Sequence, residues 1–344
     1  MYDTDAIRRG HPIADVAAAA GLELRQTAGR LVGICPFHGD SRPSLVLYPA
    51  SQSYYCFGCG AGGDVIDFVS RLHRVGFRDA AAILTGERQP SETPSTPVAT
   101  PRPERKLDPE QVAAIVEVAV GFYHQALWSH PRALNYLHDR GVSNRTAEEC
   151  RLGVGVRGLA AVLAQRGLDL VTAESLGLLA EGREPFVGRV IIPDLIDGRA
   201  SWFTGRRLDD REPRYLNLRV EKPILGLNRV DGDAVVVVEG PFDWLTAVEW
   251  DFAAAALLGT RVSDRAERQL DRFEQVYLAL DNDEAGHQAT AELADRLVHR
   301  AIPVRLPHGV HDVSGLAQNG GRAAFIRCML QAGREARSSA QRAA

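Results

Sequence analysis

Four acidic side chains fall in two short motifs that could bind metal ions. Glu239 and Asp243 belong to the segment Glu-Gly-Pro-Phe-Asp, and Asp281 and Asp283 open the later segment Asp-Asn-Asp-Glu-Ala-Gly. Carboxylates brought together repel one another, and hard oxygen ligands of this kind suit Mg²⁺ or Mn²⁺ together with substrate phosphates. The alternative is that these acids cap helices or are solvated loop charges.

A second set of residues has the spacing of a zinc site. Cys35-Pro-Phe-His38 and Cys56-Phe-Gly-Cys59 are two short knuckles, each of which supplies two ligands. Because Cys35, His38, Cys56 and Cys59 fill all four positions, they predict a closed, structural Zn²⁺ site. The alternative is a small core of reduced cysteines with an incidental histidine.

The acidic motifs each follow an apolar run that predicts a strand. Ala234–Val238 precedes the first motif and Val276–Leu280 precedes the second, and such runs are typical of strands buried on both faces of a parallel sheet. Helix-forming segments follow at Trp244–Trp250 and Ala285–Ala301, which gives β-α-β-α order. Ligands bind outside the carboxyl ends of such strands, so Glu239, Asp281 and Asp283 should meet at one edge.

Basic residues precede these strands along the chain. They stand at turns between expected strands, where they could bind phosphates beside a carboxylate–metal cluster: Arg189, Arg206, Arg214 and Lys222. A solvated basic face is the alternative, because Asp209, Asp210 and Glu212 are interspersed among them.

Composition limits the class of protein. The chain has 344 residues, 45% of them hydrophobic and 24% charged, which is ordinary for a globular protein of two or three domains. The net charge of −4 predicts no general attraction to nucleic acid, so any such binding must come from local patches. No apolar run is long enough to span a bilayer and the N-terminus is charged, so we expect a cytoplasmic protein without a membrane partner.

Both motif groups resemble those of one family. Glu239-Gly-Pro-Phe-Asp243 followed by Asp281-Asn-Asp283-Glu-Ala-Gly286 resembles the TOPRIM domain of bacterial DnaG-type primases, topoisomerases and some nucleases. The surroundings of the two knuckles, including Tyr55-Cys-Phe-Gly-Cys-Gly60, resemble the zinc ribbon at the N-terminus of DnaG-type primases, which contacts single-stranded template. Tyr54, Tyr55 and Phe57 are candidate stacking faces there, and Arg42 is a candidate phosphate partner.

The basic run is similar to the segment that precedes TOPRIM in primase cores. Arg189, Arg206, Arg214 and Lys222 occupy its cationic positions, although Arg214 stands where the family usually has lysine. Asp312 corresponds to a later acidic motif that usually has a second aspartate, whereas this chain has Ser314 or Gly315 there.

The resemblance implies an α+β and α/β fold. We expect a small zinc-ribbon β domain at residues 1–86, a Pro-rich linker at 87–106 and a mixed N-terminal part of the primase core at 107–230. A TOPRIM subdomain with a parallel sheet should follow at 231–330, and a disordered tail at 331–344. A helicase-binding domain is not expected, so the protein resembles a compact primase, with a replicative helicase supplied in trans.

The implied activity is that of a DNA primase, which synthesises short RNA primers from NTPs on single-stranded DNA. Glu239, Asp281, Asp283 and Asp312 would hold Mg²⁺ or Mn²⁺ for two-metal nucleotidyl transfer, and Asp243 would orient Glu239 or a metal-bound water. The alternatives are a TOPRIM nuclease, or a single-stranded-DNA-binding accessory protein with a degenerate catalytic site.

Overall fold

The computed structural model describes residues 2–27, 29–40, 43–88, 107–180, 182–259, 264–317 and 321–343. They divide into two compact units. The N-terminal unit contains Met1–Val112, Asp169–Phe186 and Arg206–Leu216, and the core unit contains Ala113–Leu168, Val187–Gly205 and Asn217–Ala344. The expected linker lies almost entirely outside the described residues. Within the described part of the chain, no helix is both long and apolar enough to cross a membrane.

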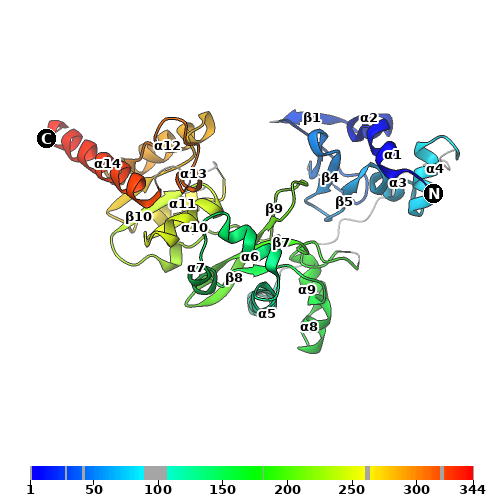
Figure 1. Cartoon of the computed structure of the whole chain (residues 1–344), viewed down its shortest axis with the longest axis horizontal. Coiled ribbons are helices and arrows are strands. Elements are labelled where there is room, and N and C mark those ends of the chain that lie inside the picture. Colours follow the sequence, from blue (N-terminus) through cyan, green and yellow to red (C-terminus); the bar gives the residue numbers. More distant parts are fainter. Residues whose placement is uncertain are drawn as a thin grey trace. The chain divides into compact units, whose positions relative to one another are not determined.

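The N-terminal unit is built on a five-stranded antiparallel sheet in the order β1-β2-β3-β4-β5. The strands are β1 (Leu24–Thr27), β2 (Arg30–Gly33), β3 (Leu45–Tyr48), β4 (Ser53–Cys56) and β5 (Gly62–Asp64), with the 3₁₀ turn η1 (Pro49–Ser51) between β3 and β4. Four helices accompany the sheet: α1 (Thr4–Gly10), α2 (Ile13–Ala19), α3 (Val65–His73) and α4 (Phe77–Leu84) (Figure 1). Alternate side chains of β3 and β4 form a buried core with α3, because alternate residues of a strand face the same side of the sheet.

The first part of the core unit is largely helical. Its helices are α5 (Pro109–Leu127), α6 (Pro131–His138), α7 (Asn144–Glu149) and α8 (Leu159–Gln165), whereas α9 (Leu170–Ser175) belongs to the N-terminal unit. At the start of α5, Asp108 Oδ1 accepts a hydrogen bond from the amide of Glu110 at 3.1 Å, and Pro109 is the first helical residue. A four-stranded sheet follows in the order β6-β7-β8-β9, made of β6 (Gly153–Val154), β7 (Arg189–Ile196), β8 (Arg199–Arg207) and β9 (Tyr215–Asn217).

The parallel sheet predicted from the apolar runs is present in the order β11-β10-β12-β13. It consists of β10 (Ala234–Val238), β11 (Ala254–Ala256), β12 (Gln275–Leu278) and β13 (Ala301–Pro303), and all three pairings are parallel. The 3₁₀ turn η2 (Leu227–Arg229) precedes it. Its connecting helices are α10 (Pro241–Glu249), α11 (Asp264–Leu270) and α12 (Glu284–Leu297). The 3₁₀ turn η3 (Val298–Arg300) joins α12 to β13, and the short helix α13 (Val313–Leu316) follows β13.

The prediction that the C-terminal residues are disordered was wrong. Residues 331–344 were expected to form a disordered tail, but α14 (Gly321–Ala343) continues to the penultimate residue and runs outward from the parallel sheet (Figure 1). Its start is anchored by Phe325, which is buried and lies 5.0 Å from the ring of Phe252. The segment beyond is rich in Ala and Arg, which favour a helix once its first turns are fixed.

Candidate metal centres

The two predicted knuckles meet at one end of the antiparallel sheet. The ligand atoms of Cys35, His38, Cys56 and Cys59 all lie within 4.8 Å of one another. The pairing of β3 with β4 puts Leu45 opposite Cys56, and the amide of Phe57 donates to the carbonyl of Ser44 at 2.9 Å. In the described part of the chain, this is the one group of three or more His, Cys, Asp or Glu side chains with ligand atoms this close.

The chemistry of this group fits Zn²⁺. Cys35 Sγ lies 4.0 Å from Cys59 Sγ, and hydrogen bonds to Cys56 and Cys59, together with burial, raise the pKa of Cys35 far above its ordinary value. A divalent cation would relieve this crowding, since zinc ligands are thiolates. Gly58 also makes room for the histidine, because a Cβ there would lie 2.5 Å from His38 Nε2. The donors therefore suit a structural zinc ion.

The aromatic residues near this group differ in exposure. Tyr54 is buried and its ring packs at 5.2 Å against Phe68 in the core, and Tyr55 is also buried. Phe57, between the two cysteines of the second knuckle, is 44% exposed. Of the three expected stacking faces, Phe57 alone presents its ring to solvent, and Arg42 lies outside the described residues.

The first acids stand at neighbouring strand ends. Glu239 directly follows β10 and Asp281 follows β12, and these two strands pair in parallel. Glu239 Oε2 is buried and has no hydrogen-bond partner, although the amide of Asp281 lies close enough to lower the pKa of this carboxyl. A buried carboxylate oxygen left unpaired is costly, and a bound cation would satisfy it.

The other acids lie on the helices that follow. Asp243 is in the first turn of α10, is buried, and accepts a hydrogen bond from the amide of Ser314 at 2.8 Å. Asp283 caps α12 by accepting from the amide of Gly286 at 2.8 Å, and Asp312 caps α13 by accepting from Gly315 at 2.6 Å. The capping alternative is therefore correct for one oxygen of each of these two acids. A carboxylate has further acceptor sites, so capping does not exclude metal binding.

The electrostatics of this acidic cluster favour a cation. Burial, followed by the nearby charges of Asp243 and Glu239, raises the pKa of Asp281 to about 8. Burial and the charge of Asp312 raise the pKa of Asp243 to about 7. The pKa of Glu239 is raised by burial and by the charge of Asp283. Metal-free, the cluster tends to keep protons, and a divalent ion would replace them.

Glycines let the chain turn tightly around these acids. A Cβ at Gly286 would lie 2.0 Å from the carbonyl oxygen of Asp281, and one at Gly240 would lie 2.6 Å from Asp243 Oδ2. Gly286 therefore permits a close approach to the backbone that no other residue allows, and Gly240 leaves space for the carboxylate of Asp243. This explains physically why each acidic motif contains a glycine.

Two of the four predicted cations belong to the core unit, as the acids do. Lys222 Nζ donates to the carbonyl of Leu258 at 3.1 Å, and the amide of Leu258 donates to the carbonyl of Glu239 at 3.0 Å. Lys222 is thereby tied to the loop after β11. Arg189 is different: it is only 1% exposed, and its guanidinium donates to the carbonyl of Gly205 at 3.2 Å.

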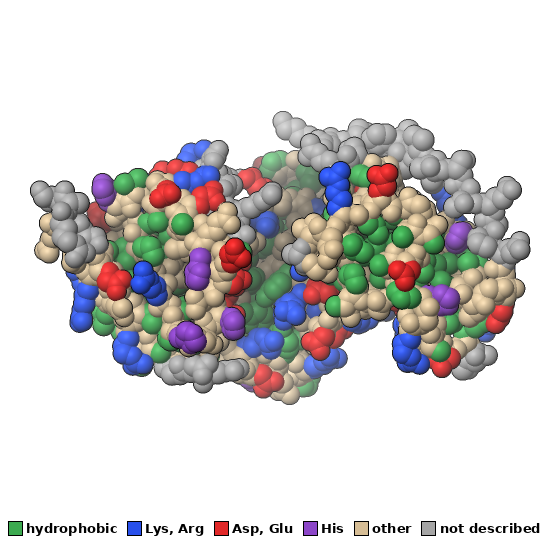
Figure 2. Space-filling view, turned by 90° about the horizontal axis from the view of Figure 1, so that it is seen from above, with side chains coloured by type: hydrophobic (Ala, Val, Ile, Leu, Met, Phe, Trp, Pro, Cys, Tyr) green, Lys and Arg blue, Asp and Glu red, His purple; other side chains and the backbone are tan. Residues whose placement is uncertain are grey.

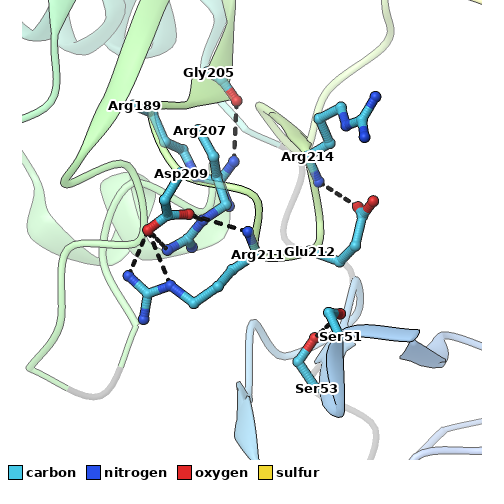
Figure 3. Close-up of polar contacts among 9 residues, drawn as sticks. All are labelled: Ser51, Ser53, Arg189, Gly205, Arg207, Asp209, Arg211, Glu212 and Arg214. Carbon is cyan, nitrogen blue, oxygen red and sulfur yellow. Dashed lines mark hydrogen bonds and ion pairs between the residues drawn. The ribbon is translucent and has the colours of Figure 1, made fainter. Parts of the chain in front are cut away.

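Arg206 and Arg214 belong to the N-terminal unit: Arg206 lies near the end of β8, and Arg214 lies just before β9. The guanidinium of Arg206 lies 5.0 Å from the ring centre of Tyr215. The side chain of Arg214 points away from Asp209, and its amide donates to Glu212 Oε2 at 2.6 Å (Figure 3). The structure therefore does not place these two cations relative to the acids.

Sequence reasoning missed an ion pair cluster on this loop. Arg207 Nη2 and Arg211 Nη2 lie 3.0 and 2.7 Å from Asp209 Oδ2, and Figure 3 shows both guanidinium groups turned toward this carboxylate. The hydrogen bond from Arg207 is the main reason that the pKa of Asp209 is lowered. The sequence signal that could have revealed this ion pair cluster is the i, i+2 spacing of opposite charges at a turn. Figure 2 likewise shows acidic and basic side chains interspersed on the face in view.

Three family models match the chain in sequence order. Residues 2–95 match the CHC2 zinc finger, residues 122–224 match the N-terminal domain of the DNA primase catalytic core, and residues 236–314 match a Toprim-like domain. Together they span most of the chain. The metal-ligand candidates fall within the first and third of these matches.

Individual proteins give the same result. The chain is 31% identical to the DNA primase of Aquifex aeolicus over 338 residues, which covers 89% of this chain and 64% of that relative. The solved zinc-binding and RNA polymerase domains of the Aquifex aeolicus primase align with a TM-score of 0.58 and 28% identity, over 96% of this chain and 85% of that one. A DnaG primase catalytic domain bound to single-stranded DNA aligns with a TM-score of 0.56 and 26% identity, over 64% of this chain and 81% of that one.

Proposed function

The chain belongs to the family of DnaG-type DNA primases, and from this premise we propose that it synthesises short RNA primers on single-stranded DNA. The observation that carries the proposal is the acidic cluster at the carboxyl ends of β10 and β12, where Glu239 Oε2 is buried without a partner. Crowded acids that can hold a divalent metal ion are what nucleotidyl transfer requires. The relative bound to single-stranded DNA supports such a template.

In the proposed reaction, the 3′-hydroxyl oxygen of the primer forms a bond with the α-phosphorus of an NTP. The bond from that phosphorus to the bridging oxygen of the pyrophosphate breaks, pyrophosphate leaves, and the hydroxyl proton passes to water. Mg²⁺ or Mn²⁺, when bound, would lower the pKa of that hydroxyl and neutralise charge on the phosphates. Glu239, Asp281, Asp283 and Asp312 are the residues proposed to hold it.

The remaining residues are proposed to position these groups. Asp243 fixes the start of α13 through Ser314, and so the place of Asp312. Arg206, Arg214 and Lys222 are proposed to bind triphosphate or template backbone. Arg189 is buried, so it contributes by holding the carbonyl of Gly205.

The N-terminal site is proposed to hold a structural zinc ion through Cys35, His38, Cys56 and Cys59. Its exposed Phe57 offers a ring on which a template base can stack. A replicative helicase acting in trans is a further proposed partner. The domain limits at residues 86, 106 and 230 remain predictions.

A primer synthesis assay tests the proposal. The full chain is incubated with single-stranded DNA, labelled ribonucleotides and Mg²⁺ or Mn²⁺, and short labelled RNA that disappears in the Asp281→Asn variant is expected. A shortened template instead of RNA would favour a nuclease. Retention of template without either product would favour a single-strand-binding accessory protein.

A further inference from the structure

The residue between the two acids of the second motif makes three hydrogen bonds. The amide of Asn282 donates to the carbonyl of His311 at 2.6 Å, and its side-chain Nδ2 donates to the carbonyl of Val310 at 3.1 Å. Its Oδ1 lies 2.9 Å from Nε2 of His287. Two of these bonds join the end of β12 to the loop before α13, and the third joins it to α12.

The network fixes which atoms donate. Because Nδ2 donates to Val310, Oδ1 faces the imidazole, and an amide oxygen can only accept. His287 Nε2 must therefore carry a hydrogen. Both polar atoms of the Asn282 side chain contact protein groups, so the orientation of its amide is defined.

The loop that Asn282 holds carries the last acid of the cluster. Asp312 directly follows His311, and its Oδ1 accepts from Gly315 at 2.6 Å and from the hydroxyl of Ser314 at 3.1 Å. The amide of Ser314 donates to Asp243 on α10. The loop is thus joined to the β12 end through Asn282 and to α10 through Asp243.

We propose that Asn282 and His287 are positioning residues that hold the loop of residues 310–312, and with it Asp312, against the acidic cluster so that a divalent cation binds tightly. This inference rests on the proposed function, because it concerns the same acids. Their proposed role is to position Asp312, not to contact the reacting groups. Such supporting residues typically change metal affinity by ten-fold or more when they are lost.

Titration of the full chain with Mn²⁺ alone, followed by the electron paramagnetic resonance signal of free Mn²⁺, tests the proposal. Asn282→Ala removes both side-chain bonds and is expected to weaken binding about ten-fold. His287→Ala is expected to weaken Mn²⁺ binding about three-fold. His287→Gln, which keeps a hydrogen-bond donor, should bind Mn²⁺ about as tightly as the unaltered chain. Gln288→Ala, on an exposed neighbour in α12, is the matched control and should bind as the unaltered chain does.

The double variant, which combines Asn282→Ala with His287→Ala, tests whether the two residues act together on Mn²⁺ binding or weaken it independently. Because one hydrogen bond joins Asn282 to His287, the combined loss should stay close to the ten-fold loss of Asn282→Ala rather than multiply. Unfolding temperatures should remain within about 2 °C of the unaltered chain. Full multiplication of the two losses overturns the proposal.

Unchanged Mn²⁺ affinity in Asn282→Ala also overturns it. If that variant does not fold, the pair His287→Ala and His287→Gln decides, and equal affinities of the two would refute the inference. A chain that binds Mn²⁺ in this Asn282-dependent way but makes no RNA would leave the inference standing and refute the proposed function.

Discussion

Replacing Asp281 by Asn should stabilise the metal-free protein at alkaline pH. The pKa of Asp281 is raised from 3.8 to about 8, mainly by burial and then by the charges of Asp243 and Glu239. A group whose pKa is raised in the folded state contributes stability that is fully present below its unfolded pKa and lost as the pH rises through the folded one. The metal-free chain should therefore lose stability between about pH 4 and pH 8.

The size of the effect follows from the same values. At 1.36 kcal/mol per pKa unit, the difference between 3.8 and 8 sets a ceiling of about 6 kcal/mol at pH 8. Asp281 is only partly buried and its charge interacts with that of Asp243, so screening and coupling reduce this to roughly 1–2 kcal/mol. For a protein of this size that corresponds to an increase in Tm of about 2–6 °C.

Tryptophan fluorescence provides the assay, because Trp244 directly follows Asp243 in α10 and Trp250 is at the C-terminal end of the same helix. Melting curves are recorded at pH 5 and pH 8 after transfer into magnesium-free buffer, and again with Mg²⁺. Asp281→Asn should melt higher than the unaltered chain at pH 8, nearly equally at pH 5, and should lose most of the stabilisation that Mg²⁺ provides. Asp295→Asn, an exposed acid of α12, is the matched control.

Two outcomes would contradict this reasoning. The melting temperature of the unaltered chain could be independent of pH in magnesium-free buffer, which would mean that the acids are not crowded. Alternatively, Mg²⁺ could stabilise Asp281→Asn as strongly as the unaltered chain, which would mean that this carboxylate is not a ligand.

Two further predictions concern the basic loop and the segment before the parallel sheet. Asp209→Asn should tighten binding of single-stranded DNA a few-fold at low salt, because two guanidinium groups lose their internal partner. Fluorescence anisotropy measures this affinity, with Asp210→Asn as the control. Equal affinities of the two variants would contradict the prediction. Gly226→Ala should destabilise the chain by about 2–4 kcal/mol in chemical denaturation, because its Cβ would lie 2.3 Å from Trp244 Nε1. Gly232→Ala also has a positive φ but open space, so equal losses in both variants would show that the clash is unimportant.

The sequence predicted features that depend on residues close together in the chain. The spacing of Cys35, His38, Cys56 and Cys59 anticipated a group that does converge, because tight knuckles bring their own ligands together. The strand Ala234–Val238 was predicted with its exact limits, since a continuous apolar run bounded by polar residues has few alternatives. The helix at residues 331–343 was missed, because its anchor at Phe325 depends on contact with Phe252 in another segment.

The chain by itself thus determined which side chains are available and at which strand ends they stand, because residue type and local spacing are written directly in it. Only the tertiary structure decided that Phe57 is exposed while Tyr54 is buried, and that Arg189 is enclosed. It also decided that Asn282 joins two segments that carry acids. These outcomes depend on packing and hydrogen bonds between residues distant in sequence, which no local pattern specifies.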